Sequence, residues 1–167
     1  AHPQPEGIGE IHHLRMRMER ELSGEDETRF NLKKGRGGLV DIEFLTQMLQ
    51  LAHGYRHPEL RRRETLRALT ALSEQNILKK REYKLLTDVY LFLRTLDHRL
   101  RLEQDQSIDA FEREPGRLER IAHALGYNLK RDHRKRTSKA GQKLLRDYES
   151  RREKIRRCYE SYFLLER

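Results

Sequence analysis

Apolar residues recur at spacings of three and four along most of the chain, which is the period of a helix with one buried face. The segment from Lys80 to Leu102 shows this most clearly, because its leucines, valine and Tyr90 fall on one broad stripe. In a second long segment, Lys139 to Phe163, a 4-3-4-3-4 spacing predicts a seam against another helix, formed by Leu144, Tyr148, Arg151, Ile155, Cys158 and Tyr162. No segment shows the strict alternation that is typical of a strand. We therefore predict an all-α fold, a bundle of about six helices.

Glycine, proline and asparagine divide the rest of the chain into shorter helical segments. Gly54, Asn76 and Gly126 are expected to end helices, and Pro115 suits the first turn of one. The predicted shorter helices are Gly7–Leu22, Leu39–His53, Leu60–Gln75 and Pro115–Leu125. Two connectors are predicted: Gln104–Glu114, which Ile108 and Phe111 would anchor to the core, and the basic stretch Asn128–Ser138, which we expect to be mobile.

Composition narrows the class of protein further. Charged residues make up 38% of the chain and apolar residues 35%, which suits amphipathic helices with solvated outer faces. The net charge of +9 attracts polyanions, but a solvated basic face explains it more often than nucleic-acid binding. No apolar run approaches the length of a membrane span, so no membrane partner is expected. The single Cys158 excludes an intrachain disulfide and is typical of the cytoplasm, and the start at Ala1 fits a piece of a longer protein.

The most informative stretch is a glycine-rich loop from Lys33 to Gly38, which has three glycines in four positions. A glycine loop that leads into a helix N-terminus can hold an anion, because free N–H groups and the positive end of the helix dipole point out of it. Here Asp41 and Glu43 follow at once and would repel a phosphate. The loop is therefore a candidate site but a poor phosphate cradle.

The predicted helix Leu39–His53 is apolar over more than half of its circumference, so we expect it to be central and packed on several sides. Asp41 falls in line with Leu45 and Met48 on the apolar side, whereas Glu43 falls on the polar stripe. Two interpretations of Asp41 remain open: a structural cap or buried ion pair, and an acid in or behind an active site. Glu43 is expected to be solvated or at an interface.

A second polar line lies on the long helix, where Arg94, His98 and Arg101 share one stripe and Asp97 can pair with Arg101. This line is either a solvated basic stripe or a surface on which Arg94 and His98 face an acid, with Asp41 the candidate. The sequence has no His-Glu-x-x-His motif and no paired cysteines, so we expect no metal site. No catalytic arrangement of serine, cysteine and histidine is predicted either.

The residues around the glycine loop also resemble a known family. The stretch Asn31–Phe44 reads (basic)-x-Gly-x-Gly-Gly-x-x-(Asp/Glu)-Ile-Glu-Phe, and with His53–Leu60 and Tyr90–Leu100 it resembles glutamine synthetase adenylyltransferases. That family often has glutamate at Asp97 and glutamine at Arg101. The resemblance covers most of the chain between residues 30 and 127. Within it, the residues Leu39-Val40-Asp41 and the segment 120–127 resemble the C-terminal half of the family's enzymes, which carries the adenylylating activity.

The resemblance implies a large bifunctional cytoplasmic enzyme with two nucleotidyltransferase halves, each followed by a helical domain. One half transfers AMP from ATP, with magnesium, to a tyrosine of glutamine synthetase, and the other removes it by phosphorolysis. PII signal proteins and glutamine set the balance. The family's metal-binding aspartates lie in a Gly-Ser and Asp-x-Asp pattern, which this chain lacks, since Asp105 has no second aspartate at the needed spacing. The chain alone is therefore expected to hold no catalytic residue, to bind no ATP or magnesium, and to be inactive.

The resemblance also implies a division of the chain and roles for the loop. Residues 1–30 would form a connecting helix and linker from a preceding segment, and residues 31–167 the nucleotidyltransferase-associated helical domain. This domain would pack against its own nucleotidyltransferase domain and shape a nucleotide or protein-substrate cleft, or a regulatory interface. The residues expected to approach that cleft are Lys33, Lys34, Arg36, Gly37 and Gly38, with Asp41 the most sensitive to mutation. The alternatives are the equivalent domain of a PII uridylyltransferase and a basic helical nucleic-acid-binding module.

Overall fold

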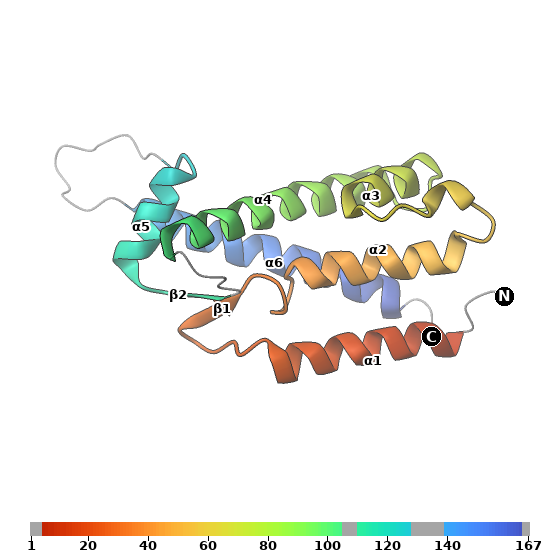
Figure 1. Cartoon of the computed structure of the whole chain (residues 1–167), viewed down its shortest axis with the longest axis horizontal. Coiled ribbons are helices and arrows are strands. Elements are labelled where there is room, and N and C mark those ends of the chain that lie inside the picture. The colour runs from red at the N-terminus through yellow and green to blue at the C-terminus, as the bar shows by residue number, and fades with distance from the viewer. Residues whose placement is uncertain (1–4, 105–109, 128–138, 165–167) are drawn as a thin grey trace.

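The computed structural model describes residues 5–104, 110–127 and 139–164. Within these ranges the chain forms long helices joined by short loops, with a small two-stranded ribbon near one end (Figure 1). The prediction of an all-α bundle is confirmed. The elements are α1 (Pro5–Leu22), β1 (Arg29–Asn31), α2 (Leu39–His53), the 3₁₀ turn η1 (Pro58–Leu60), α3 (Thr65–Glu74), α4 (Lys80–Gln104), β2 (Ala110–Glu112), α5 (Pro115–Ala124) and α6 (Ala140–Leu164).

Helix α2 is the central element, as its apolar circumference predicts. It contacts α1, α3, α4 and α6, and these helices run roughly along the long axis of the molecule (Figure 1). Helix α5 lies across one end and packs mainly against α6. A single hydrophobic core runs between the helices. Helix α4 contributes Leu86, Val89, Leu93 and Leu96 to it, each with at most 1% of its surface exposed.

The C-terminal seam is also confirmed. Leu144, Tyr148, Ile155 and Cys158 of α6 are buried, as the 4-3-4-3-4 spacing predicts, whereas the other two seam positions, Arg151 and Tyr162, are half-buried. The predicted stops hold as well. Asn76 adopts a positive φ of 55° directly after α3, and Gly126 adopts a φ of +82° after α5, which are the left-handed conformations that end helices.

The expectation of no strands is wrong in one place. Strands β1 and β2 pair antiparallel, with Arg29 opposite Glu112 and Asn31 opposite Ala110. Three residues are too few for an alternating pattern to show, so the sequence could not reveal this ribbon. The predicted anchor Ile108 and the basic linker 128–138 lie outside the described residues.

Helix α3 begins at Thr65, later than the predicted Leu60. The amide of Gln50 on α2 donates hydrogen bonds to the carbonyl oxygens of Leu60 (2.5 Å) and Arg62 (2.8 Å). These bonds fix the segment between η1 and α3 to α2 in a non-helical conformation.

Helix α1 turns a different face inward than its leucines suggest. Ile8 and Arg15 are buried, whereas Leu14 and Leu22 are 51% and 53% exposed. The side chain that settles the orientation of α1 is thus an arginine, which the apolar pattern alone could not identify. In the part of the chain that the structure describes, no helix is both long and apolar enough to span a membrane.

Candidate functional site

The glycine loop is closed by its own hydrogen bonds. The backbone N–H groups of Lys33 and Lys34 donate to the side-chain oxygen of Asn31, and that of Arg36 donates to Glu25. Gly35 and Gly38 donate to carbonyl oxygens within the loop, and so do the first residues of α2. Every backbone N–H from residue 33 to residue 41 therefore has an acceptor in the chain. A phosphate would find no free backbone N–H here, so the loop cannot work as a backbone anion cradle in this conformation.

The carboxylate of Asp41 occupies the place that an external anion would take. It lies in the first turn of α2 and accepts the N–H of Gly37 at 2.8 Å. It also pairs with Arg15 (Nε–Oδ1, 2.5 Å) and faces Arg156 (Nη1–Oδ2, 3.4 Å). Asp41 and Arg15 are fully buried, with 0% of either side chain exposed. Of the two interpretations of Asp41, these contacts support the buried ion pair and helix-terminus anion.

The two arginines tie the loop to helices that are far away in sequence. Arg15 comes from α1 and donates to the carbonyl of Gly35 at 2.9 Å. Arg156 comes from α6 and also binds Glu19 (2.7 Å) and Glu160 (2.6 Å). Burial alone would lower the pKa of the Arg156 guanidinium, but Glu160, Asp41 and Glu19 together raise it above its ordinary value. One carboxylate on α2 thus joins α1, the loop and α6.

Gly37 is a glycine for two reasons. Its φ of +69° lies in the left-handed region, and a Cβ at this position would run into the backbone carbonyl of Arg152 on α6. The Arg152 side chain reinforces this approach, since Nε donates to the carbonyl of Arg36 at 2.7 Å and Nη2 pairs with Glu25 at 2.6 Å. The loop lets the backbone of α6 lie directly on the start of α2.

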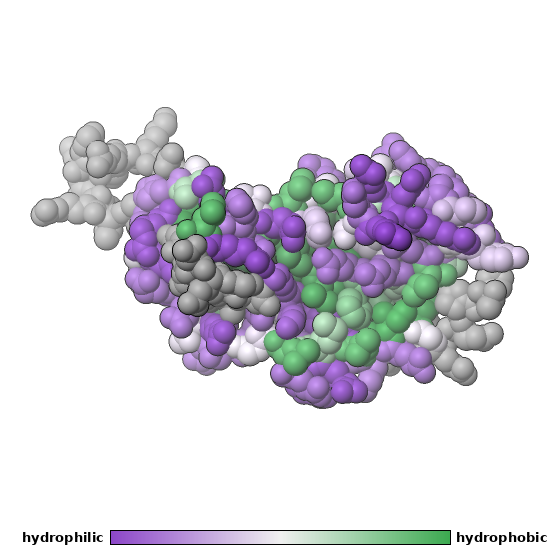
Figure 2. Space-filling view, viewed as in Figure 1, coloured by the Kyte–Doolittle hydropathy of each residue, from purple (hydrophilic) through white to green (hydrophobic). Residues whose placement is uncertain are grey.

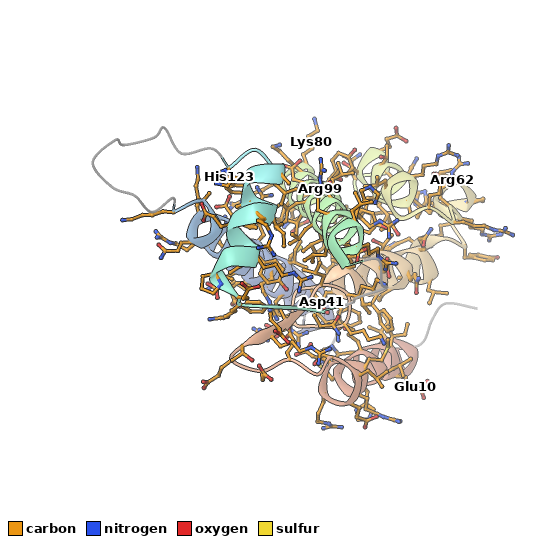
Figure 3. The ribbon with its side chains drawn as sticks, turned by 60° about the vertical axis from the view of Figure 1, so that its left-hand side comes forward. Glu10, Asp41, Arg62, Lys80, Arg99 and His123 are labelled. Atoms are coloured by element: carbon orange, nitrogen blue, oxygen red, sulfur yellow. The ribbon has the colours of Figure 1, made fainter. Side chains whose placement is uncertain are left out.

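Of the two interpretations of the polar line on α4, the one in which Arg94 and His98 face Asp41 is wrong. Figure 3 places Asp41 near the centre of the molecule, between α1 and the other helices, where Arg15 and Arg156 already occupy both carboxylate oxygens. Arg94 and His98 are exposed on α4. The predicted pair of Asp97 with Arg101 does form, at 3.1 Å.

The structure gives Arg94 a different acidic neighbour, Glu43. Burial raises the pKa of the half-buried Glu43 carboxyl above its ordinary value, while the charges of Arg94 and Lys33 act to lower it. The loop, α2 and α4 therefore place Lys33, Glu43 and Arg94 close enough to interact. Arg36 lies on the other side of the loop and contacts Glu160 (3.3 Å) and the carboxylate of Glu153 (3.7 Å) on α6.

Sequence reasoning did not find Arg15 or Arg156. A signal for each was present: Arg15 lies seven residues after Ile8 and four after Ile11, and Arg156 lies three residues before Tyr159 and seven before Phe163. A charged side chain on an apolar stripe predicts a buried partner of opposite charge. Among the described residues, no group of three or more His, Cys, Asp or Glu side chains is arranged to hold a metal ion.

Comparison with known proteins identifies a family that the chain matches. The family model described as GlnD PII-uridylyltransferase matches residues 10–163, which is nearly the whole chain. A bifunctional glutamine synthetase adenylyltransferase/adenylyl-removing enzyme from Rhodopseudomonas palustris (strain TIE-1) is 37% identical over 124 residues, which is 72% of this chain and 12% of that protein.

Two further relatives carry the same name. The protein from Bradyrhizobium sp. (strain ORS 278) is 42% identical over 97 residues, and that from Xanthomonas oryzae pv. oryzae (strain MAFF 311018) is 43% identical over 97 residues. Each match covers 58% of this chain and 10% of the relative, so the chain spans only about a tenth of the length of these proteins. The chain therefore belongs to the GlnD PII-uridylyltransferase family of domains and is similar to one region of bifunctional glutamine synthetase adenylyltransferase/adenylyl-removing enzymes.

Proposed function

We propose that this chain is the helical domain that follows a nucleotidyltransferase domain in a bifunctional enzyme that adenylylates and deadenylylates glutamine synthetase. The names of the curated relatives support this assignment. ATP and magnesium would be held by the nucleotidyltransferase domain, in the cytoplasm, and a PII signal protein would regulate the balance. Residues 1–30 would connect the two domains, and residues 31–167 would form the helical unit.

The observation that carries this proposal is exposed apolar surface on α1 and α2. We call it the α1–α2 face and define it by Leu14, Leu22 and Leu51. Leu14 and Leu22 of α1 lie eight residues apart and are 51% and 53% exposed, and Leu51 of α2 is 58% exposed. Figure 2 shows hydrophobic side chains gathered over α2 and along the adjoining edge of α1. Large apolar side chains exposed together with such a hydrophobic area are typical of an interface. We infer that the nucleotidyltransferase domain covers it.

Charged residues suit the rim of the same interface. Lys33 and Arg94 lie near Glu43 at the glycine-loop end of α2, where an interacting domain with bound nucleotide phosphates would meet positive charge. Lys34 and Arg36 belong to the same loop and are only partly buried. In this proposal the closed loop fixes the position of these cations, and Gly37, Gly38 and Asp41 act by holding the loop in shape.

The proposal is tested by AMP transfer from radiolabelled ATP to glutamine synthetase. The 167-residue chain alone should transfer nothing, whereas the longer enzyme should transfer AMP. In the longer enzyme, the double substitution Leu14→Asp and Leu51→Asp should reduce transfer strongly, because it puts carboxylates into an apolar contact. Leu102→Asp is the matched control, since Leu102 is 65% exposed at the far end of α4.

Two outcomes would refute the proposal. Transfer by the chain alone would show that catalysis does not need another domain. Equal activity of the α1–α2 face variant and the Leu102→Asp control would show that the apolar surface is not a functional contact. Circular dichroism of both variants separates a lost contact from a lost fold.

A second candidate function follows from the description of the matching family model. The equivalent domain of a PII uridylyltransferase would have the same helical architecture but would serve a different nucleotide and target protein. Supplying the longer enzyme with ATP or UTP, and with glutamine synthetase or PII as acceptor, separates the two. Transfer of UMP to PII with no transfer of AMP to glutamine synthetase would favour this candidate.

A further inference from the structure

The segment that includes η1 and the start of α3 carries several exposed arginines, most of which have no acidic partner among the described residues. All five arginines of the segment 56–67 are exposed, against two glutamates in the same segment, Glu59 and Glu64. Arg67 pairs with Glu64 at 2.9 Å, but no carboxylate among the described residues lies within ion-pair distance of the other four. On α6, by contrast, Arg152, Arg156 and Arg157 all have carboxylate partners. We call this group the arginine corner: Arg56, Arg61, Arg62, Arg63 and Arg67.

Backbone contacts orient two of these arginines before any ligand arrives. Nε of Arg61 donates to the carbonyl of Gly54, and Nε of Arg62 donates to the carbonyl of Glu59, both at 3.1 Å. The segment itself is fixed to α2 by the amide of Gln50. The terminal guanidinium nitrogens of Arg61 and Arg62 stay available to a ligand, and little side-chain entropy remains to be lost on binding.

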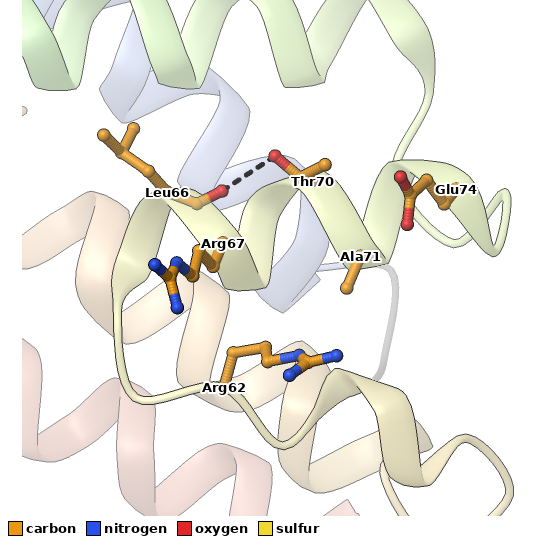
Figure 4. Close-up of a pocket in the computed structure, with 6 residues that line it drawn as sticks. All are labelled: Arg62, Leu66, Arg67, Thr70, Ala71 and Glu74. Atoms are coloured by element: carbon orange, nitrogen blue, oxygen red, sulfur yellow. Dashed lines mark hydrogen bonds between the residues drawn. The ribbon is translucent and has the colours of Figure 1, made fainter.

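A hollow lies between the arginine corner and α3. Its volume is about 420 Å³, and Figure 4 shows Arg62 and Arg67 on one side of α3 with Leu66, Ala71 and Glu74 along the helix. Ala71 is buried and Leu66 is half-buried, so the floor is partly apolar. The hydroxyl of Thr70 donates to the carbonyl of Leu66 at 3.0 Å and lies 3.3 Å from the hydroxyl of Tyr83. The hollow combines cationic walls with an apolar floor.

We propose that the arginine corner is a docking site for an acidic segment of a partner protein, whose carboxylates contact Arg62, Arg63 and Arg67 while one apolar side chain enters the hollow. Charge complementarity supports this occupant, since five arginines face outward with two glutamates beside them. A nucleic acid fits less well, because none of the lining residues is an aromatic on which a base could stack, and the partly apolar floor suits an apolar side chain instead. Glu74 lies at the Ala71 end of the hollow, so the carboxylates of the segment are placed at the arginines. This proposal is independent of the adenylyltransferase assignment.

The test is fluorescence anisotropy of the 167-residue chain with a short fluorescein-labelled peptide that repeats Glu-Glu-Leu. Binding should weaken as salt rises. The pair Arg62→Gln and Arg63→Gln should weaken it about threefold to tenfold, since exposed charge pairs contribute modestly each. The matched control is Arg99→Gln with Arg146→Gln, which removes the same charge from exposed positions on α4 and α6 and should leave binding unchanged.

A second pair of variants tests the hollow. Thr70→Glu places a carboxylate at its edge and should weaken peptide binding, whereas Thr95→Glu makes the same change at an exposed threonine of α4 that also bonds back to a carbonyl. The proposal is overturned if the peptide does not bind at low salt, or if the control variants weaken binding as much. It is also overturned if an oligo-dT strand binds more tightly than the peptide and responds to the same arginine substitutions. Thermal melts confirm that each variant is folded.

Discussion

Replacing Asp41 by asparagine tests the structural account of the glycine loop. Asn keeps the shape and an oxygen that can accept the N–H of Gly37, but it removes the charge between Arg15 and Arg156. Arg15 is fully buried, so its guanidinium would lose its closest carboxylate at a place that water does not reach. Arg156 would keep Glu19 and Glu160. Arg15 would keep only Glu19, at 3.3 Å, a partly exposed carboxylate that it shares with Arg156. The change therefore measures the cost of removing the fully buried partner of Arg15.

The expected cost is large relative to the stability of a domain. Breaking a buried ion pair from one side costs about 3–5 kcal/mol, and because Arg15 keeps Glu19 we expect a value at the lower end of this range. A domain of this size is stable by about 5–15 kcal/mol, so the Asn variant should unfold at much lower urea concentration or be only partly folded. The comparison is Asp88→Asn, because Asp88 pairs with Lys84 at 2.8 Å but both side chains are exposed. That pair should contribute about 0.2–1 kcal/mol.

The assay is urea denaturation followed by circular dichroism, applied as a double-mutant cycle. Adding Arg15→Met to Asp41→Asn removes the stranded charge and keeps the acceptor for Gly37, so the double variant should recover stability. The coupling energy between the two positions should be about 1.5–3 kcal/mol. If Asp41→Asn costs no more than Asp88→Asn, or if the double variant is as unstable as the sum of the single variants, the buried pair does not organise the loop.

Three further predictions concern the loop and the buried side chains. Gly37→Ala should destabilise the chain by about 2 kcal/mol or more in urea denaturation, because φ is +69° and a Cβ would meet the backbone of Arg152. The control Gly24→Ala, at a φ of +57° with open space around it, should cost only about 1 kcal/mol. Equal costs would show that α6 does not contact the loop closely. Burial raises the pKa of the Cys158 thiol to about 12, so it should react with Ellman's reagent at pH 8 only when the chain unfolds; rapid reaction of the folded chain would contradict this burial. Burial and the bond to Asp147 raise the pKa of Tyr127 to about 12 from 10.0, so the fold favours the protonated phenol and its contribution to stability is present below pH 10 and lost as the pH rises toward 12. A titration followed by absorbance at 295 nm should show that Tyr127→Phe removes a phenol that ionises well above pH 10. If the substitution removes a phenol that ionises near pH 10, this prediction is refuted.

The sequence predicts the helices well, because their apolar stripes are long. Helices α2, α4 and α6 lie within one or two residues of the predicted ranges, and the burial of Leu93 and Tyr148 follows from spacing alone. The burial of Asp41 follows in the same way, from its position in line with Leu45 and Met48. What fails is smaller and depends on contacts between distant segments. The β1–β2 ribbon and the late start of α3 at Thr65 are set by hydrogen bonds across the fold, which no local pattern records.

The partner of Asp41 shows the same limit more sharply. Sequence spacing places the acid on the buried side but says nothing of which helix crosses there, so Arg94 and His98 were reasonable candidates. Arg15 and Arg156 come from α1 and α6, 26 residues before and 115 residues after Asp41. Only the packing of α1 and α6 on the loop brings them together. The expectation that the loop residues Lys33 to Gly38 approach a cleft stays a prediction.

The central claim is that this chain works by presenting its α1–α2 face to a nucleotidyltransferase domain. Isothermal titration calorimetry of the chain against that separately produced domain tests it most directly. We predict saturable binding with a negative heat-capacity change, as apolar burial requires. Binding should be lost with Leu14→Asp and Leu51→Asp and kept with Leu102→Asp. The claim is contradicted if two folded partners do not bind, or if the α1–α2 face variant binds as tightly as the control.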